Sequence, residues 1–112
     1  MIKVLIERQV NKNNYSKVMD YLKDIRSAAV RQPGFLTAET LVKGEDPVDI
    51  LAISTWFSES YWVAWQTKQS RIGIEDHITS FLLREPRITI YKVPDQVEPN
   101  KEAEGTDEDA FG

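Results

Sequence analysis

The sequence predicts an α+β fold in which strands and helical regions follow in the order β-α-β-β-α-β. Three observations predict it. Four stretches alternate apolar and polar side chains with a period of two, as strands do. Two regions place apolar side chains at helical spacing, and glycine, proline and polar residues separate the segments. A length of 112 residues allows one domain with at most a tail.

The N-terminal half contributes a strand at residues 2–10 and a helix at residues 15–32. One face of the strand carries Arg8 among the apolar residues Ile2, Val4, Ile6 and Val10. The helix is predicted to end at the sequence "QPG", because proline cannot continue the helical hydrogen bonds and glycine accepts a left-handed exit.

The remaining elements are strands at residues 35–43, 49–57 and 87–93, with a helical region between the last two. The sequence "GEDPVD" suits a hairpin between the second and third strands. The helical region is predicted to run from Ser58 or Glu59 to about Leu83, with Gly73 as the point where it could break.

Two crossovers flanking a central hairpin give a ferredoxin-like plait, a four-stranded antiparallel sheet with both helical regions on one face. The other face would carry Leu5, Leu41 and Ile53, which are too apolar to leave in water. Because large exposed apolar faces mark interfaces, we expect a homodimer packed sheet to sheet.

Charge and composition exclude several classes of function. Residues 95–112 hold seven of the 18 acidic and one of the 14 basic side chains, so they carry −6 and leave residues 1–94 with +2. The body has no basic stripe for nucleic acid, and no apolar run could span a membrane. The start lacks the apolar core of a signal peptide, so a cytoplasmic location is expected. We predict a domain at residues 1–93 and an acidic, disordered tail at residues 94–112.

All three tryptophans lie in the segment "STWFSESYWVAWQT". Trp62 and Trp65 are three residues apart and share a helix face, whereas Trp56 lies on a strand. If the helix packs over that face of the sheet, Trp56 and Trp65 wall a pocket. The alternative is that the indoles only fill the core, which their geometry alone favours.

Two charged or titratable residues are candidates for chemistry. His77 is the single histidine and lies beside the apolar stripe of its helical region, the position of a boundary residue more often than of a base. Arg8 lies on an apolar strand face and needs a buried partner or an anionic ligand, and a salt bridge with a helix carboxylate is the favoured choice. One histidine without any cysteine argues against a zinc site, so no metal is predicted.

The segments "IKVLIERQV", "RQPGFLTAETL", "ISTWFSESYWVAWQTKQSR" and "EPRITIYKV" together resemble the antibiotic biosynthesis monooxygenase domain family. The resemblance covers about residues 1–93. It implies a dimeric α/β barrel and a pocket for a flat aromatic molecule between the sheet and the second helical region. Members of this family include cofactor-independent oxygenases that oxidise polycyclic aromatic substrates to quinones, and a related branch binds and degrades haem.

The match to the haem-degrading branch is incomplete. Trp65 corresponds to the helix tryptophan that distorts the macrocycle in those relatives. Their first-strand asparagine corresponds to Glu7 here, and their axial histidine to Glu75. Haem binding or degradation is therefore the second choice.

The resemblance leads to the prediction of a cofactor-independent monooxygenase acting on a small aromatic or quinol substrate. Trp65 and His77 are the predicted catalytic residues, with His77 taking a phenolic proton. The predicted substrate-binding residues are Trp56, Arg8, Glu7 and Tyr91. A third hypothesis is a non-catalytic module that binds a small molecule.

Overall fold

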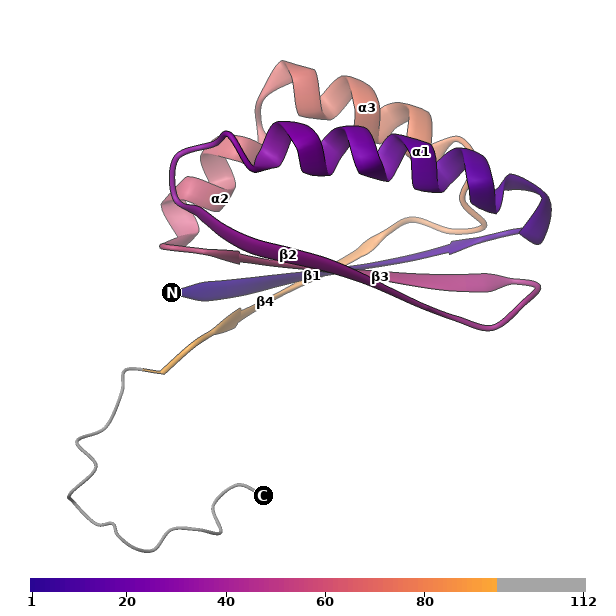
Figure 1. The fold of residues 1–112 in the computed structure, drawn as a ribbon, viewed down its shortest axis with the longest axis horizontal. Coiled ribbons are helices and arrows are strands. Elements are labelled where there is room, and N and C mark those ends of the chain that lie inside the picture. Colours follow the sequence, from indigo (N-terminus) through magenta and orange to yellow (C-terminus); the bar gives the residue numbers. More distant parts are fainter. Residues whose placement is uncertain (95–112) are drawn as a thin grey trace, which may run out of the picture.

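The computed structural model describes residues 1–94 and has two layers, a sheet and a set of helices that cover one face of it (Figure 1). The elements in chain order are β1 (Ile2–Val10), α1 (Lys12–Ala29), β2 (Phe35–Lys43), β3 (Val48–Trp56), α2 (Glu59–Gln66), α3 (Gln69–Thr79) and β4 (Arg87–Lys92). The predicted α+β ferredoxin-like fold is confirmed for the protomer. The predicted tail lies almost wholly outside the described residues.

The four strands form an antiparallel sheet in the order β2-β3-β1-β4. The central pair, β1 and β3, is in register from Ile2 opposite Trp56 to Val10 opposite Val48. The apolar face of β1 lies under the helices, and its four apolar residues are at most 6% exposed. The alternation in the sequence therefore decides which face of the sheet becomes the core.

The second helical region differs from the prediction, because it is two helices that meet at Thr67 and Lys68 instead of breaking near Gly73. The Thr67 hydroxyl donates to the carbonyl oxygen of Val63 at 2.9 Å, and its backbone lies outside the helical region at φ −95° and ψ 2°. The break gives α3 a new direction, alongside α1 (Figure 1). Gly73 lies inside α3.

The first helix begins at Lys12, three residues before the predicted start at Tyr15. Its first turn is polar, so apolar periodicity could not reveal it. The amide of Lys12 donates to Asp46 Oδ1 at 3.2 Å, so the hairpin between β2 and β3 satisfies one of the free amides of the first turn. None of the helices in the described part of the chain is long and apolar enough to cross a membrane.

Two glycines should respond in opposite directions to alanine substitution. Gly34 has φ +82°, and a Cβ there would overlap the Tyr61 ring, so Gly34→Ala should lower the free energy of unfolding by about 1–2 kcal/mol. Gly73 is helical with open space around it, so Gly73→Ala should raise that free energy by about 0.5–1 kcal/mol. Urea unfolding of both variants measures the difference, and a neutral Gly34→Ala would contradict the steric argument.

Candidate functional site

A cavity of about 60 Å³ lies between the sheet and the helices. Its walls are mainly apolar and aromatic, and they include Ile6, Leu22, Phe35, Trp56, Trp62 and Trp65. Arg8 and Arg71 contribute buried polar groups, while the exposed residues Arg26 and Glu39 also line it. The fold thus brings strand and helix side chains that are distant in the sequence around one small space.

The tryptophans are at once core residues and walls of this cavity. Trp56 is fully buried and Trp62 and Trp65 are each 2% exposed. The Trp56 ring packs edge-on against Trp62, with centroids 5.9 Å apart, and against Phe35 at 5.5 Å. Its indole N–H donates to Ser54 Oγ at 3.0 Å, so the buried polar atom is satisfied. The two interpretations of the tryptophan segment, core and pocket wall, therefore both apply.

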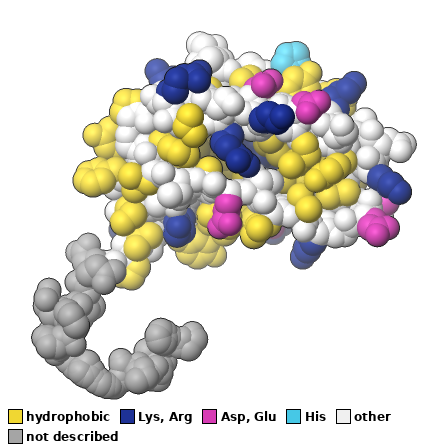
Figure 2. Space-filling view, viewed as in Figure 1, with side chains coloured by type: hydrophobic (Ala, Val, Ile, Leu, Met, Phe, Trp, Pro, Cys, Tyr) yellow, Lys and Arg dark blue, Asp and Glu magenta, His cyan; other side chains and the backbone are white. Residues whose placement is uncertain are grey.

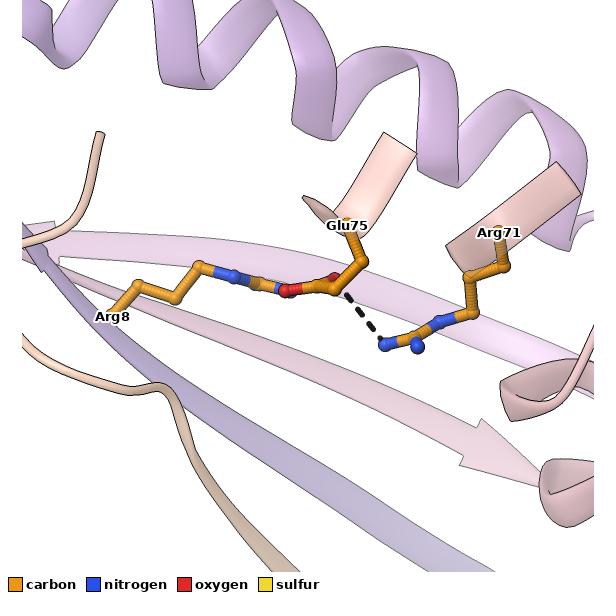
Figure 3. Close-up of polar contacts among 3 residues, drawn as sticks. All are labelled: Arg8, Arg71 and Glu75. Carbon is orange, nitrogen blue, oxygen red and sulfur yellow. Dashed lines mark hydrogen bonds and ion pairs between the residues drawn. The ribbon is translucent and has the colours of Figure 1, made fainter. Parts of the chain in front are cut away.

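Arg8 meets a carboxylate from the helix layer, which confirms the favoured salt bridge. Its Nη2 lies 2.8 Å from Oε1 of Glu75 on α3, and Nη2 of Arg71 lies 3.4 Å from the same oxygen (Figure 3). Arg71 and Glu75 are four residues apart and therefore share one face of α3. We refer to Arg8, Glu75 and Arg71 as the arginine cluster.

The two arginines of the cluster are buried and only partly satisfied. Arg8 is 2% and Arg71 5% exposed, and the Nε of each has no hydrogen-bond partner among the described residues. Burial lowers the pKa of Arg71; the Glu75 carboxylate opposes this shift, and the nearby Arg8 charge adds to it. The Arg71 guanidinium also lies over the Trp62 ring, 5.2 Å from its centroid. Two cations thus share one carboxylate beside an aromatic wall.

Toward solvent, a side-chain contact bridges α1 and β2. Arg26 Nη2 donates to Thr40 Oγ1 at 3.4 Å, and both residues line the cavity. Because Arg26 is exposed and the contact is long, little free energy opposes its opening.

The structure does not bring the other three predicted site residues to the cavity. His77 is exposed at the surface of the helix layer, where it stacks on Tyr21 with ring centroids 5.4 Å apart (Figure 2). Glu7 lies on the opposite face of the sheet, where it lines a separate hollow of about 540 Å³. Tyr91 is 57% exposed and lies opposite Lys3 in the ladder, on that same face.

Three residues of the site were not predicted from the sequence. Trp62 and Arg71 line the cavity, and Glu75 holds Arg8 and Arg71 beside it. The i, i+4 spacing of Arg71 and Glu75 was visible in the sequence. Their inward orientation was not, because it depends on the break at Thr67 and Lys68.

The residues present do not fit haem. Glu75, at the position of the axial histidine in the haem-degrading relatives, is engaged by Arg8 at 2.8 Å. The cavity of about 60 Å³ is also far smaller than a macrocycle. Within residues 1–94, no group of three or more His, Asp or Glu side chains is arranged to hold a metal ion.

The family model for antibiotic biosynthesis monooxygenase matches residues 1–71. The chain belongs to the antibiotic biosynthesis monooxygenase family. Membership of this family supports a monooxygenase-type function. The search of curated proteins finds no match to the sequence.

Solved structures share the fold at low sequence identity. A conserved protein from Methanosarcina mazei is 19% identical with a TM-score of 0.75, over 81% of this chain and 90% of that one. A candidate antibiotic biosynthesis monooxygenase from Deinococcus radiodurans is 13% identical with a TM-score of 0.77, over 88% and 97%. A variant of SnoaB from Streptomyces nogalater, described as a cofactor-independent oxygenase, is 10% identical with a TM-score of 0.72, over 86% and 96%. At these identities the likeness concerns the fold.

Proposed function

We propose that this member of the antibiotic biosynthesis monooxygenase family oxidises a small aromatic or quinol substrate with dioxygen, without a metal or flavin. The observation that carries the proposal is the tryptophan-walled cavity with buried arginines at its wall. Apolar walls with a few convergent polar groups are typical of small-molecule sites. The description of SnoaB as a cofactor-independent oxygenase supports the same choice.

The reaction requires a substrate that can itself give electrons to dioxygen. In a substrate with a ring-activated methylene, a proton first passes to solvent water, and the resulting anion reduces dioxygen and bonds to it. The peroxide anion then takes a proton from water and becomes a hydroperoxide. Loss of water then leaves a carbonyl, so that R₂CH₂ and O₂ become R₂C=O and H₂O. A quinol has no such methylene and would take the oxygen at a ring carbon, so that hydroquinone, C₆H₆O₂, and O₂ become hydroxyquinone, C₆H₄O₃, and H₂O. The protein would hold the ring between the indoles, exclude water and stabilise the negative charge that develops on the substrate.

The volume of the cavity limits the substrate. A cavity of about 150 Å³ accepts a benzene ring in another protein, whereas this one measures about 60 Å³. A substrate must therefore widen it, and parting Arg26 from Thr40 moves only exposed or half-buried side chains. Small ring systems should accordingly be better substrates than large polycyclic ones.

Oxygen uptake with anthrone-like and hydroquinone substrates tests the proposal. Trp65→Phe replaces an indole in the cavity wall by a smaller aromatic ring and so leaves extra space beside the substrate. We expect it to lower kcat/KM by about 10- to 100-fold, because the substrate is held less accurately. His77→Ala is the matched control, because His77 is exposed and outside the cavity.

Each outcome of this comparison is informative. Absence of uptake with every substrate would remove the monooxygenase proposal for these compounds. A loss of turnover in His77→Ala as large as in Trp65→Phe would return His77 to the catalytic role predicted from the sequence.

The burial of the three tryptophans also favours one alternative, a module that binds a ligand without turning it over, in which the tryptophans mainly form the core. This alternative predicts that ligands quench tryptophan fluorescence while oxygen uptake stays at the level without protein. In either case we propose that the active form is a homodimer, joined through the sheet face that carries Leu5, Leu41 and Ile53.

A further inference from the structure

We propose that the cavity selects an aromatic ligand carrying one oxyanion group, and that Arg8 and Arg71 are the residues that bind this group. The inference rests on the proposed function, because it assigns the substrate to the same cavity. Its test depends on binding and not on turnover.

The first argument is the charge around the cavity. Among the described residues that line it, Arg26 and Glu39 are of opposite sign and exposed, so they contribute little net field. The arginine cluster holds two cations and one carboxylate, which leaves a net charge of +1 in a buried place. An uncompensated buried charge is costly, and a ligand of opposite charge removes that cost.

The second argument is the pair of free donors. The Nε–H groups of Arg8 and Arg71 are both buried without a partner among residues 1–94, although their Nη2 atoms share Glu75 Oε1. A buried donor without an acceptor costs about 1–3 kcal/mol, and an acceptor atom brought within hydrogen-bond distance of either Nε would recover that cost. A guanidinium edge suits a planar oxyanion because its donors lie in one plane.

The third argument is the surroundings of the two donors. Trp62 lies beneath the Arg71 guanidinium, and the remaining walls of the cavity are mainly apolar. An oxyanion attached directly to an aromatic ring matches this arrangement, since the ring can occupy the apolar part while the oxygen reaches the arginines. A carboxylate on the ring and a phenolate or enolate oxygen share this chemistry.

Three probes of similar size separate charge from shape: nitrobenzene, 4-nitrophenol above its pKa, and 4-nitrobenzoate. We expect the wild-type protein to bind at least one of the two anions about tenfold or more tighter than nitrobenzene, measured by quenching of tryptophan fluorescence. Preference for the phenolate identifies the ionised form of a phenolic substrate as the ligand. Preference for the benzoate identifies an aromatic carboxylate.

Variants of the arginine cluster should move this preference in opposite directions. Arg71→Met leaves the Arg8–Glu75 pair neutral and should abolish the preference, whereas E75Q raises the net charge to +2 and should strengthen it about tenfold or more. If the cluster were purely structural, both variants would lose stability. The ratio of the affinity for the anions to the affinity for nitrobenzene would then not fall in one variant and rise in the other. Arg31→Met removes one exposed positive charge away from the cavity and should leave the ratio unchanged.

Equal affinity for all three probes, or failure of all three to bind, would overturn the inference. Anion preference without any oxygen uptake would leave the inference standing and remove the monooxygenase proposal. Oxygen uptake by a wild-type protein that shows no anion preference would remove the inference and leave the monooxygenase proposal standing.

Discussion

Replacing Glu75 by leucine is expected to lower the free energy of unfolding by about 3–5 kcal/mol, because it leaves two buried guanidinium groups without their shared carboxylate. Arg8 is 2% and Arg71 5% exposed, so little water reaches the two guanidinium groups to replace the lost carboxylate. Unfolding in urea, followed by tryptophan fluorescence, measures the change.

The neighbouring residue on α3 supplies the control for this prediction. Asp76 is exposed and forms no ion pair among the described residues, so Asp76→Leu should change stability by less than about 0.5 kcal/mol. Combining Glu75→Leu with Arg8→Met and Arg71→Met removes the unpaired charges and should recover most of the loss. A Glu75→Leu protein within about 1 kcal/mol of wild type would show that the arginines find other partners.

The strands and their faces could be predicted because their causes are local. Alternation in β1 places Ile2, Val4, Ile6 and Val10 on one side, and the pleat alone then puts Arg8 among them. An arginine on such a face must find a partner, so the salt bridge followed from the cost of burying a charge. The same alternation puts Glu7 on the opposite face, and the structure agrees.

The orientation of α3 could not be predicted, because it depends on a break that the apolar pattern does not mark. Thr67 ends α2 through a hydrogen bond of its own hydroxyl and a backbone conformation outside the helical region. After the break, Arg71 and Glu75 lie on the inner face of the new helix. Two further residues turn a helix by about 200°, which carries His77 to the outer surface. The spacing of Arg71 and Glu75 was visible in the sequence, but the face of the helix layer to which they point was not.

Introducing a charge on the bare sheet face should separate the proposed dimer. Leu41 lies on β2 and is 50% exposed in the protomer, so Leu41→Glu should cost a monomer less than about 0.5 kcal/mol. In a dimer with twofold symmetry the same change buries two carboxylates, one from each copy. Because burying unpaired charges costs several kcal/mol, we expect the dissociation constant of the dimer to rise at least about 100-fold.

Sedimentation equilibrium over a range of concentrations measures this effect. Val63→Glu adds the same charge at a residue of α2 that is 45% exposed, in the helix layer on the other side of the sheet, and should leave the assembly unchanged. The hollow of about 540 Å³ beside Leu5, Leu41 and Leu51 gives a partner side chain room to insert, which a flat sheet would not. A wild-type protein that stays monomeric at all concentrations would contradict the dimer, and it would leave the cavity on the helix side as a site complete in one copy.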